Sequence, residues 1–194
     1  MTTTELADAE VHALVVDDEK EVADAYALRL DGVCETATVY GGAAALDHIA
    51  DHTVDIVLLD RHMPAMSGDE VLEELADREF SGRVIMVTAV DPGFEVLEMP
   101  FDDYLCKPVN RTDLHAAIDH QRQVLAYETL GEYFSAESKR AVLEAEVPPD
   151  ERADRREYAA IEERVRQLDQ RIHRLLGPDP SVLEAFDSIE REDG

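Results

Sequence analysis

The chain has 194 residues, enough for one α/β core of ordinary size and a smaller second part. Its formal net charge is −27 although 45% of its residues are apolar. With two cysteines and no apolar run of about 18 residues, the composition excludes a disulfide-stapled scaffold and a membrane-spanning segment.

The acidic charge favours a protein of a salt-rich cytoplasm, because about 1 M salt screens surface charges within about 3 Å. The chain has only three lysines, which favours this halophilic interpretation over an acidic protein of an ordinary cytoplasm. The first residues, MTTTELADAE, lack the basic and apolar regions of a signal peptide. We therefore expect a soluble cytoplasmic protein, with Cys34 and Cys106 as small buried residues.

Short apolar runs and helical stretches alternate along the first two thirds of the chain. Apolar runs without alternation indicate strands buried on both faces, as in a parallel sheet covered by helices. Strands are predicted at 13–19, 54–60, 83–89 and 103–108, and a weaker one at 33–39. Helices are predicted at 19–30, 42–50 and 69–77, and a poor one near 94–97, where Pro92, Gly93 and Pro100 interrupt the pattern.

A fifth helix follows Pro108 and is predicted to run through Gln121. Asn110 can cap its first turn, with Asp113 three residues later. Five such strand-helix units with right-handed crossovers predict a flavodoxin-like, doubly wound sheet of five parallel strands in the order 2-1-3-4-5, over residues 11–121. Ligands of this fold bind at the carboxyl ends of the strands.

Polar residues occupy these strand ends. The three carboxylates among them, of Asp17, Asp18 and Asp60, are expected to repel one another, since two like charges about 4 Å apart cost about 4 kcal/mol at an effective dielectric constant near 20. Oxygen ligands with room for water suit Mg²⁺, and the backbone carbonyl of His62 can serve as a further ligand. A carboxylate here is also a credible nucleophile for phosphoryl transfer if a cation offsets the incoming charge. The residues are Asp17, Asp18, Asp60, Thr88 and Lys107.

Four motifs in strand-end register resemble the receiver domains of two-component response regulators. They are VVDD at 15–18, LLDRHMPAMSG at 58–68, VTA at 87–89 and YLCKP at 104–108. The alternative interpretation is a purely structural charge cluster at the same edge of the sheet.

The resemblance implies a phosphorylation switch. It implies Asp60 as the phosphoacceptor, Asp18 as a direct Mg²⁺ ligand and Asp17 as a ligand through water. It also implies contact of the phosphoryl group with Lys107, and a sensor histidine kinase as its source. The same resemblance implies that the switch residues are Thr88, Ala89 and Tyr104.

Residues 122–194 have a helical composition and are predicted to form a second domain, with a break at 147–149. The apolar residues of each predicted helix recur at steps of three and four, so each helix has a narrow apolar seam. Such a seam needs a partner, and the pattern allows either an antiparallel hairpin within the chain or a coiled coil in a homodimer. The seam residues are Tyr127, Leu130, Phe134, Val142 and Leu143, then Tyr158, Ile161, Val165, Leu168, Ile172 and Leu175.

This tail resembles the HalX domain found behind receiver domains in haloarchaeal regulators, through EYFSAESKRAVLE at 132–144 and EYAAIEERV at 157–165. A last helix is predicted around Val182, Leu183, Phe186 and Ile189. The stretch 152–176 holds seven arginines against five acidic residues, a small excess for binding DNA in high salt. Pairing of the arginines with nearby glutamates is the simpler interpretation.

Three functions compete on these observations. The leading one is a response regulator whose helical output docks on a partner or self-associates. A DNA-binding transcriptional regulator with the same switch is the alternative. An enzyme of the aspartyl-phosphate phosphatase type needs a second catalytic Asp two residues after Asp60, where this chain has His62. We therefore expect no turnover of external substrates.

Overall fold

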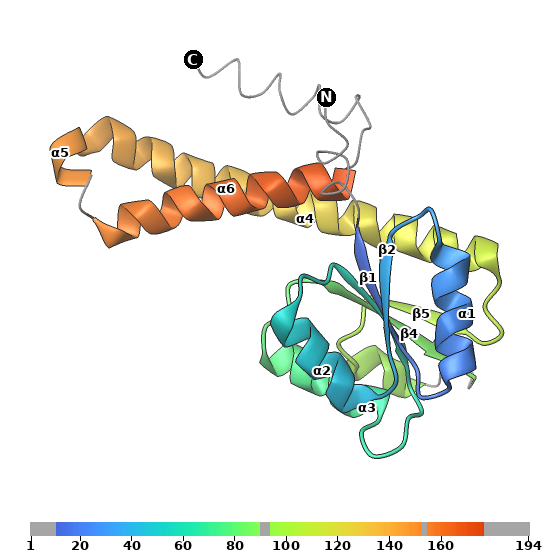
Figure 1. Ribbon diagram of the computed structural model, residues 1–194. Helices are drawn as coiled ribbons and strands as arrows, with labels where there is room; N and C mark the ends of the chain where they lie inside the picture. Colours follow the sequence, from blue (N-terminus) through green and yellow to red (C-terminus); the bar gives the residue numbers. More distant parts are fainter. Residues whose placement is uncertain (1–10, 90–93, 153–154, 177–194) are drawn as a thin grey trace. The chain divides into compact units, whose positions relative to one another are not determined.

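The computed structural model describes residues 11–89, 94–152 and 155–176, and the chain divides into two compact units (Figure 1). The boundary lies between Arg122 and Gln123. We call the described residues from 11 to 122 the sheet unit and those from 123 to 176 the helical unit. The predicted last helix, around residues 182–189, lies outside the described residues.

The sheet unit is built on five parallel strands in the order β2-β1-β3-β4-β5, which confirms the predicted topology. Each strand is four to six residues long and falls within or close to one of the apolar runs of the sequence. The strands are β1 (His12–Val16), β2 (Glu35–Val39), β3 (Ile56–Asp60), β4 (Arg83–Thr88) and β5 (Asp103–Cys106).

Helices cover both faces of this sheet (Figure 1). On one face, α2 (Gly42–Asp51) and α3 (Gly68–Asp77) pack against each other. On the other, α1 (Lys20–Leu30) lies beside the first turns of α4 (Arg111–Glu146). Arg29 Nη1 donates to the carbonyl of Val109 at 2.5 Å, and a ring nitrogen of His115 lies 2.7 Å from the carbonyl oxygen of Arg29.

Alternate residues of each central strand enter opposite halves of the core, because side chains alternate across a strand. Towards α2 and α3 the strands contribute Leu14, Val16, Val57, Leu59, Val84 and Met86. The intervening residues Ala13, Val15, Ile56, Leu58, Ile85 and Val87 are equally buried on the other side. Burial on both faces accounts for the continuous apolar runs in the sequence.

Between β4 and β5 the described residues form only a short 3-10 helix, η1 (Phe94–Glu98), as the poor apolar pattern there predicted. Phe94 and Leu97 are exposed on it. A regular fourth helix of the usual length is therefore not formed by residues 94–98.

The fifth helix is longer than predicted, because α4 does not end near Gln121 but continues without interruption to Glu146. No proline occurs between Pro108 and Pro148 to end it. The single interior glycine, Gly131, has no non-local atom within 4 Å of where its Cβ would be, and a lone glycine lowers helix stability without ending the helix.

The helical unit is an antiparallel hairpin of the second part of α4, the short α5 (Pro149–Arg152) and α6 (Arg156–Leu176). Glu132 of α4 pairs with Arg164, whereas Glu144, further along α4, accepts a 2.9 Å hydrogen bond from the hydroxyl of Tyr158. Partners thus descend along α6 as numbers rise along α4. Within this chain, the hairpin therefore brings the two predicted seams together.

The predicted seam of α6 is confirmed from Ile161 to Leu175 but not at Tyr158, which is half-buried and outside the hairpin core, and the seam of α4 needs correction. Ile161, Val165, Leu168 and Ile172 pack in the hairpin core, and Leu175 is also buried. On α4 the core residues are Leu130, Tyr133, Phe134 and Ala136. Tyr127 and Val142, assigned to the seam from spacing, are 70% and 61% exposed. A helix of 3.6 residues per turn drifts from a 3.5-residue repeat, so the buried stripe moves around a long straight helix.

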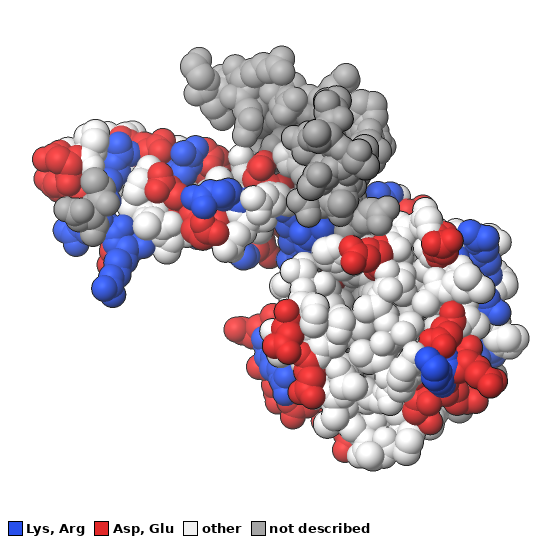
Figure 2. Space-filling view, viewed as in Figure 1, with Lys and Arg blue, Asp and Glu red and all other residues white. Residues whose placement is uncertain are grey.

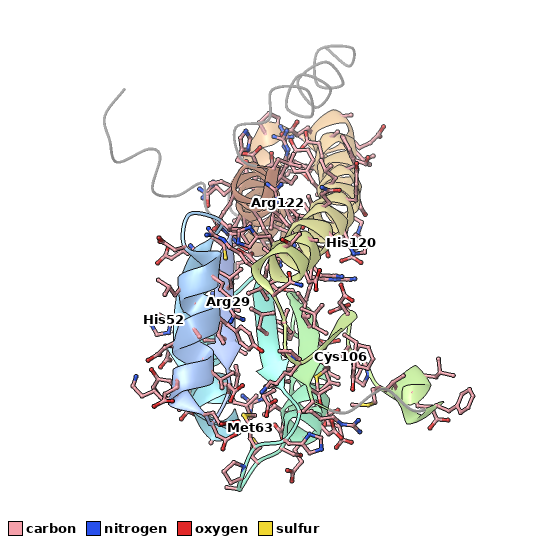
Figure 3. The ribbon with its side chains drawn as sticks, turned by 90° about the vertical axis from the view of Figure 1, so that its right-hand side faces the viewer. Arg29, His52, Met63, Cys106, His120 and Arg122 are labelled. Atoms are coloured by element: carbon pink, nitrogen blue, oxygen red, sulfur yellow. The ribbon has the colours of Figure 1, made fainter. Side chains whose placement is uncertain are left out.

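Acidic side chains gather on either side of the sheet unit in the view of Figure 2, whereas acidic and basic side chains alternate along the helical unit. Several arginines of the helical unit pair with glutamates, including Arg140 with Glu137 and Glu144, and Arg166 with Glu163. One expectation is wrong: Cys34 is buried, but Cys106 is exposed at the end of β5 (Figure 3). No helix among the described residues combines the length and apolar character needed to cross a bilayer.

Candidate functional site

The carboxyl ends of β1, β3, β4 and β5 bring the predicted polar residues to one edge of the sheet. Asp17 directly follows β1, Asp60 ends β3 and Thr88 ends β4. Lys107 follows β5, and its backbone N–H donates to the carbonyl of Thr88 at 2.7 Å. Parallel pairing of the central strands thus gathers residues that are far apart in the sequence.

Three carboxylates form a tight cluster at this edge. Asp17, Asp18 and Asp60 each place an oxygen within 4.8 Å of the others. Asp17 and Asp60 are 2% and 6% exposed, whereas Asp18 is exposed to solvent. The cluster therefore has two buried charges and one side open to an incoming ligand.

Lys107 bridges the two buried carboxylates. Its Nζ lies 2.7 Å from Asp17 Oδ2 and 2.8 Å from Asp60 Oδ1. The second oxygens have backbone partners: the N–H of Glu19 donates to Asp17 Oδ1 at 2.9 Å, and the N–H of His62 donates to Asp60 Oδ2 at 3.0 Å. One ammonium thus serves two carboxylates.

Taken together, the surroundings of Asp60 disfavour the ionised form of its carboxyl group. Burial raises the pKa of Asp60 above its ordinary value, and the hydrogen bond from Lys107 only partly opposes that effect. For Lys107, burial would lower the pKa, but the hydrogen bonds to Asp17 and Asp60 outweigh it and the pKa is raised. The two pKa shifts are consistent with each other. Two carboxylates stabilise the charged form of Lys107, whereas Asp60 shares one ammonium with Asp17 and also lies beside the Asp17 carboxylate.

The loop after β3 turns back tightly on the Asp60 backbone. Gly68, the first residue of α3, donates its N–H to the carbonyl of Arg61 at 2.9 Å. A Cβ at Gly68 would lie 2.2 Å from the backbone oxygen of Asp60, a separation that only glycine avoids. Ser67 caps α3 in a capping box with Glu70. Met63, in this loop, is buried in the core (Figure 3).

The three predicted switch residues lie on β4 and β5 or directly after β4. Thr88 is fully buried and Ala89 is exposed. Tyr104, paired with Met86 across the two strands, is half-buried against the core, with its ring centroid 5.7 Å from that of Phe101. The assigned roles of these residues, and that of the His62 carbonyl as a metal ligand, stay predictions.

Arg61 and Gly68 contribute to the site but were not singled out from the sequence. Arg61 Nε lies 3.1 and 3.2 Å from the two carboxylate oxygens of Asp69, and its side chain also hydrogen-bonds Tyr104. Arg61, which directly follows Asp60, thus connects the end of β3 to α3 through Asp69 and to β5 through Tyr104. An arginine next to Asp60 is a local signal, but its partner eight residues away is visible only in the folded chain.

The donor atoms of the cluster fit a hard divalent cation. Three carboxylates offer oxygen donors only, and two of them are buried beside a single ammonium. Oxygen donors with one open side suit Mg²⁺, which keeps several waters and binds one or two carboxylates. Asp17, Asp18 and Asp60 are the residues that would hold it.

Comparison with known protein families divides the chain in two. Residues 13–119 match the profile of the response regulator receiver domain, and residues 123–191 match that of the HalX domain. The first match alone covers more than half of the chain.

Individual relatives agree with this division. A Haloferax volcanii protein provisionally named as a transcriptional regulator is 45% identical over 139 residues, which are 71% of this chain and 24% of that protein. The transcriptional regulatory protein CutR of Streptomyces coelicolor is 40% identical over 113 residues, 56% of this chain and 52% of CutR. The chain thus spans between a quarter and about half the length of these relatives.

Solved structures share the fold of the sheet unit. A CheY-like response regulator receiver domain protein from Methanospirillum hungatei superposes with a TM-score of 0.58 at 27% identity, over 61% of this chain and 98% of that one. The response regulator protein TrrA from Thermotoga maritima, solved in complex with Mg²⁺ and a beryllium fluoride, gives a TM-score of 0.53 at 28% identity, over 57% and 98%.

Proposed function

Because the chain belongs to the two-component response regulators, with a receiver domain followed by a HalX domain, we propose that Asp60 accepts a phosphoryl group from a sensor histidine kinase. The observation that carries this proposal is the buried Asp60 carboxylate held between Lys107 and the backbone N–H of His62. A carboxylate so placed has a fixed orientation and a cation at hand for the charge that arrives with a phosphoryl group.

The transfer is a substitution at phosphorus. A carboxylate oxygen of Asp60 attacks the phosphorus atom of a phosphohistidine, the P–N bond breaks, and the electron pair returns to the imidazole. The product is an acyl phosphate on Asp60. Lys107, which contacts Asp60 Oδ1 at 2.8 Å, is placed to donate to the phosphoryl oxygens after transfer.

Asp17, Asp18 and Asp60 would hold Mg²⁺, with the His62 carbonyl as a further ligand. When bound, this ion would offset the charge of the carboxylates and of the transferring phosphoryl group. The fit rests on the oxygen-only donor set, and the Mg²⁺-bound state of the TrrA neighbour supports it. The exposed side of Asp18 leaves room for ion and donor.

Phosphorylation would then act on Thr88 and Tyr104. A phosphoryl group adds about −1.5 to −2 charges and strong acceptor oxygens, which attract the Thr88 hydroxyl and Lys107. Ala89, being small, leaves access to the group. Movement of Thr88 would allow the half-buried Tyr104 ring to turn further inward and change the surface around β4 and β5.

We propose that the helical unit carries the output by docking on a partner protein or by self-association. We further propose that the chain turns over no external substrate, because His62 stands where a second catalytic aspartate would be needed. The halophilic, cytoplasmic setting expected from the charge belongs to the same proposal.

DNA binding is the second candidate output. The names of two relatives, which describe transcriptional regulators, favour it. The pairing of Arg140, Arg164 and Arg166 with glutamates leaves fewer cationic groups for phosphates. A phosphorylated sample that shifts duplex DNA at molar KCl would support this output, and no shift at low or high salt would contradict it.

The direct test of the switch is the intact mass of the protein after incubation with acetyl phosphate and Mg²⁺ in molar KCl. We expect wild type to gain one phosphoryl group and Asp60→Ala to gain none. Asp77→Asn, an exposed residue at the end of α3, is the matched control and should gain one group. Modification of Asp60→Ala to the wild-type extent would contradict the assignment of the phosphoacceptor.

A further inference from the structure

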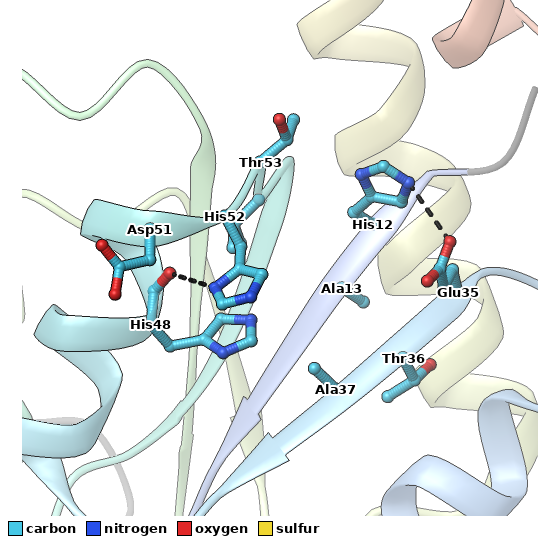
Figure 4. A pocket seen from close by; sticks show the side chains of 10 residues that line it. His12, Ala13, Glu35, Thr36, Ala37, His48, Asp51, His52 and Thr53 are labelled. Atoms are coloured by element: carbon cyan, nitrogen blue, oxygen red, sulfur yellow. Dashed lines mark hydrogen bonds and ion pairs between the residues drawn. The ribbon is translucent and has the colours of Figure 1, made fainter. Parts of the chain in front are cut away.

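A pocket of about 400 Å³ opens at the amino ends of β1 and β2, the opposite edge of the sheet from the aspartate cluster. Its floor is formed by small residues such as Ala13 and Ala37, and its rim holds His48, His52 and Asp51 at the end of α2 (Figure 4). Three of the seven histidines of the chain line this one pocket, the third being His12. The response-regulator function uses none of them.

Two of these histidines lie together. His48 is in the last turn of α2, and His52 is the residue that directly follows the helix, where the backbone is extended. Their ring centroids are 4.2 Å apart and the ring planes differ by 10° (Figure 4). The lone pairs of stacked rings lie in parallel planes, so the rings must turn before a nitrogen of each can lie about 2.0–2.1 Å from one zinc ion.

Backbone contacts also set the tautomer of His52. Its Nδ1 lies 3.1 Å from the carbonyl oxygen of His48. A carbonyl only accepts, so Nδ1 carries the hydrogen, and the lone pair of a neutral ring lies on Nε2. A ring whose other nitrogen donates to a backbone carbonyl is the usual arrangement of a metal-ligating histidine.

We propose that His48 and His52 bind a divalent transition-metal ion of the zinc type in this pocket. Imidazole nitrogens favour such borderline ions over Mg²⁺, which prefers oxygen. Asp51 and Glu35 line the same pocket and can add a carboxylate oxygen, with water completing the coordination. Glu35 also contacts His12: the distance from His12 Nε2 to Glu35 Oε2 is 3.3 Å (Figure 4).

The chain would then bind two kinds of cation at opposite edges of one sheet. Within the residues that the structure describes, the only three carboxylate or imidazole groups already gathered within 4.8 Å are Asp17, Asp18 and Asp60. The histidine pair therefore supplies two ligands, and the remaining ligands, a carboxylate oxygen and water, would join only when the metal binds. Its existence does not depend on phosphorylation of Asp60, since none of its residues belongs to that site.

The test is calorimetric titration of the full chain with ZnCl₂ in molar KCl, with excess Mg²⁺ present to occupy the aspartate cluster. We expect one Zn²⁺ per chain, with affinity lowered about tenfold or more in His48→Ala and in His52→Ala, since each variant loses one of the two imidazole ligands. Far-UV circular dichroism checks that each variant folds. Binding that is absent in wild type, or as tight in both variants as in wild type, would overturn the proposal.

His173→Ala is the matched control. Its Nδ1 lies 2.9 Å from the carbonyl oxygen of Asp169, the same local bond as in His52, but residue 169 is an aspartate rather than a second histidine. This variant should bind Zn²⁺ as wild type does. Asp60→Ala should also bind it unchanged, which separates this proposal from the switch: loss of Zn²⁺ in Asp60→Ala would place the ion in the aspartate cluster and contradict the assignment.

Discussion

Lys107 Nζ, at the end of β5, lies 2.8 Å from Asp60 Oδ1, at the end of β3. The two residues meet because β4, which lies between these strands, runs parallel to both. The same ammonium contacts Asp17 at 2.7 Å. Without Lys107, two buried carboxylates would have no neighbouring ammonium. The position therefore serves the stability of the unphosphorylated fold as well as the proposed chemistry.

Lys107→Met should lower the melting temperature in the absence of Mg²⁺. Removing one partner of a buried ion pair costs about 3 kcal/mol, because the other charges stay buried without compensation. The raised pKa of Lys107 means that its contribution is fully present at neutral pH and is lost only as the pH rises through that pKa. Thermal melts at pH 7 in molar KCl measure the loss, and Mg²⁺ should reduce it.

Lys139→Met is the control for that substitution, since Lys139 is exposed on α4. Its melting temperature should stay near that of wild type. Equal melting temperatures for all three proteins would show that Lys107 does not offset the charge of the aspartates.

Asp60→Asn should raise the melting temperature by a few degrees at neutral pH without Mg²⁺. The raised pKa of Asp60 shows that the fold disfavours its charge, chiefly through burial. The folded state then binds the proton more readily than the unfolded state, so wild type gains stability relative to Asp60→Asn as the pH falls toward that pKa. Melts from pH 7 down to pH 4 should show the two curves converging; a gap that widens would contradict the direction.

The sequence predicted the sheet and its edge well because both depend on short-range patterns. Apolar runs such as 54–60 located the strands, and right-handed crossovers then placed Asp60, Thr88 and Lys107 at a common edge. The capping of α4 by Asn110 was likewise visible in the sequence, and the side-chain oxygen of Asn110 accepts from the N–H of Asp113 at 3.0 Å.

Features that depend on contacts between distant residues could not be read from the sequence. The continuation of α4 past Gln121 is the exception, since the sequence has no proline between Pro108 and Pro148 and the prediction ended the helix too early. The exposure of Val142 depends on where α6 packs across α4. The bond between Arg61 and Asp69 depends on the turn after β3. The pairing of His48 with His52 became meaningful only with the pocket that both residues line.

Gly68→Ala should impair both stability and phosphorylation. The added Cβ would meet the Asp60 backbone oxygen at 2.2 Å, so either α3 or the end of β3 must shift. A shift of Asp60 would misplace it relative to Lys107, and we expect at least about tenfold slower modification by acetyl phosphate, since small displacements of reacting groups carry large rate penalties. Time-resolved intact mass measures the rate.

Gly131→Ala is the control for Gly68→Ala, because a Cβ at Gly131 would have no non-local atom within 4 Å and alanine favours helix. It should leave the modification rate unchanged and slightly stabilise α4. A normal rate in Gly68→Ala would mean that the loop after β3 can move without displacing Asp60.

Ile172→Ala should destabilise the helical hairpin by about 2–5 kcal/mol, the usual effect of removing a fully buried isoleucine side chain. Val142→Ala on α4 is the comparison, because this side chain is 61% exposed and its loss should change stability little. Hydrogen exchange of α4 and α6 peptides in the full chain reports the hairpin separately from the sheet unit. If Val142→Ala is as damaging as Ile172→Ala, the exposed face of α4 must be covered in solution, and a concentration-dependent exchange rate would identify a second copy of the chain as the cover.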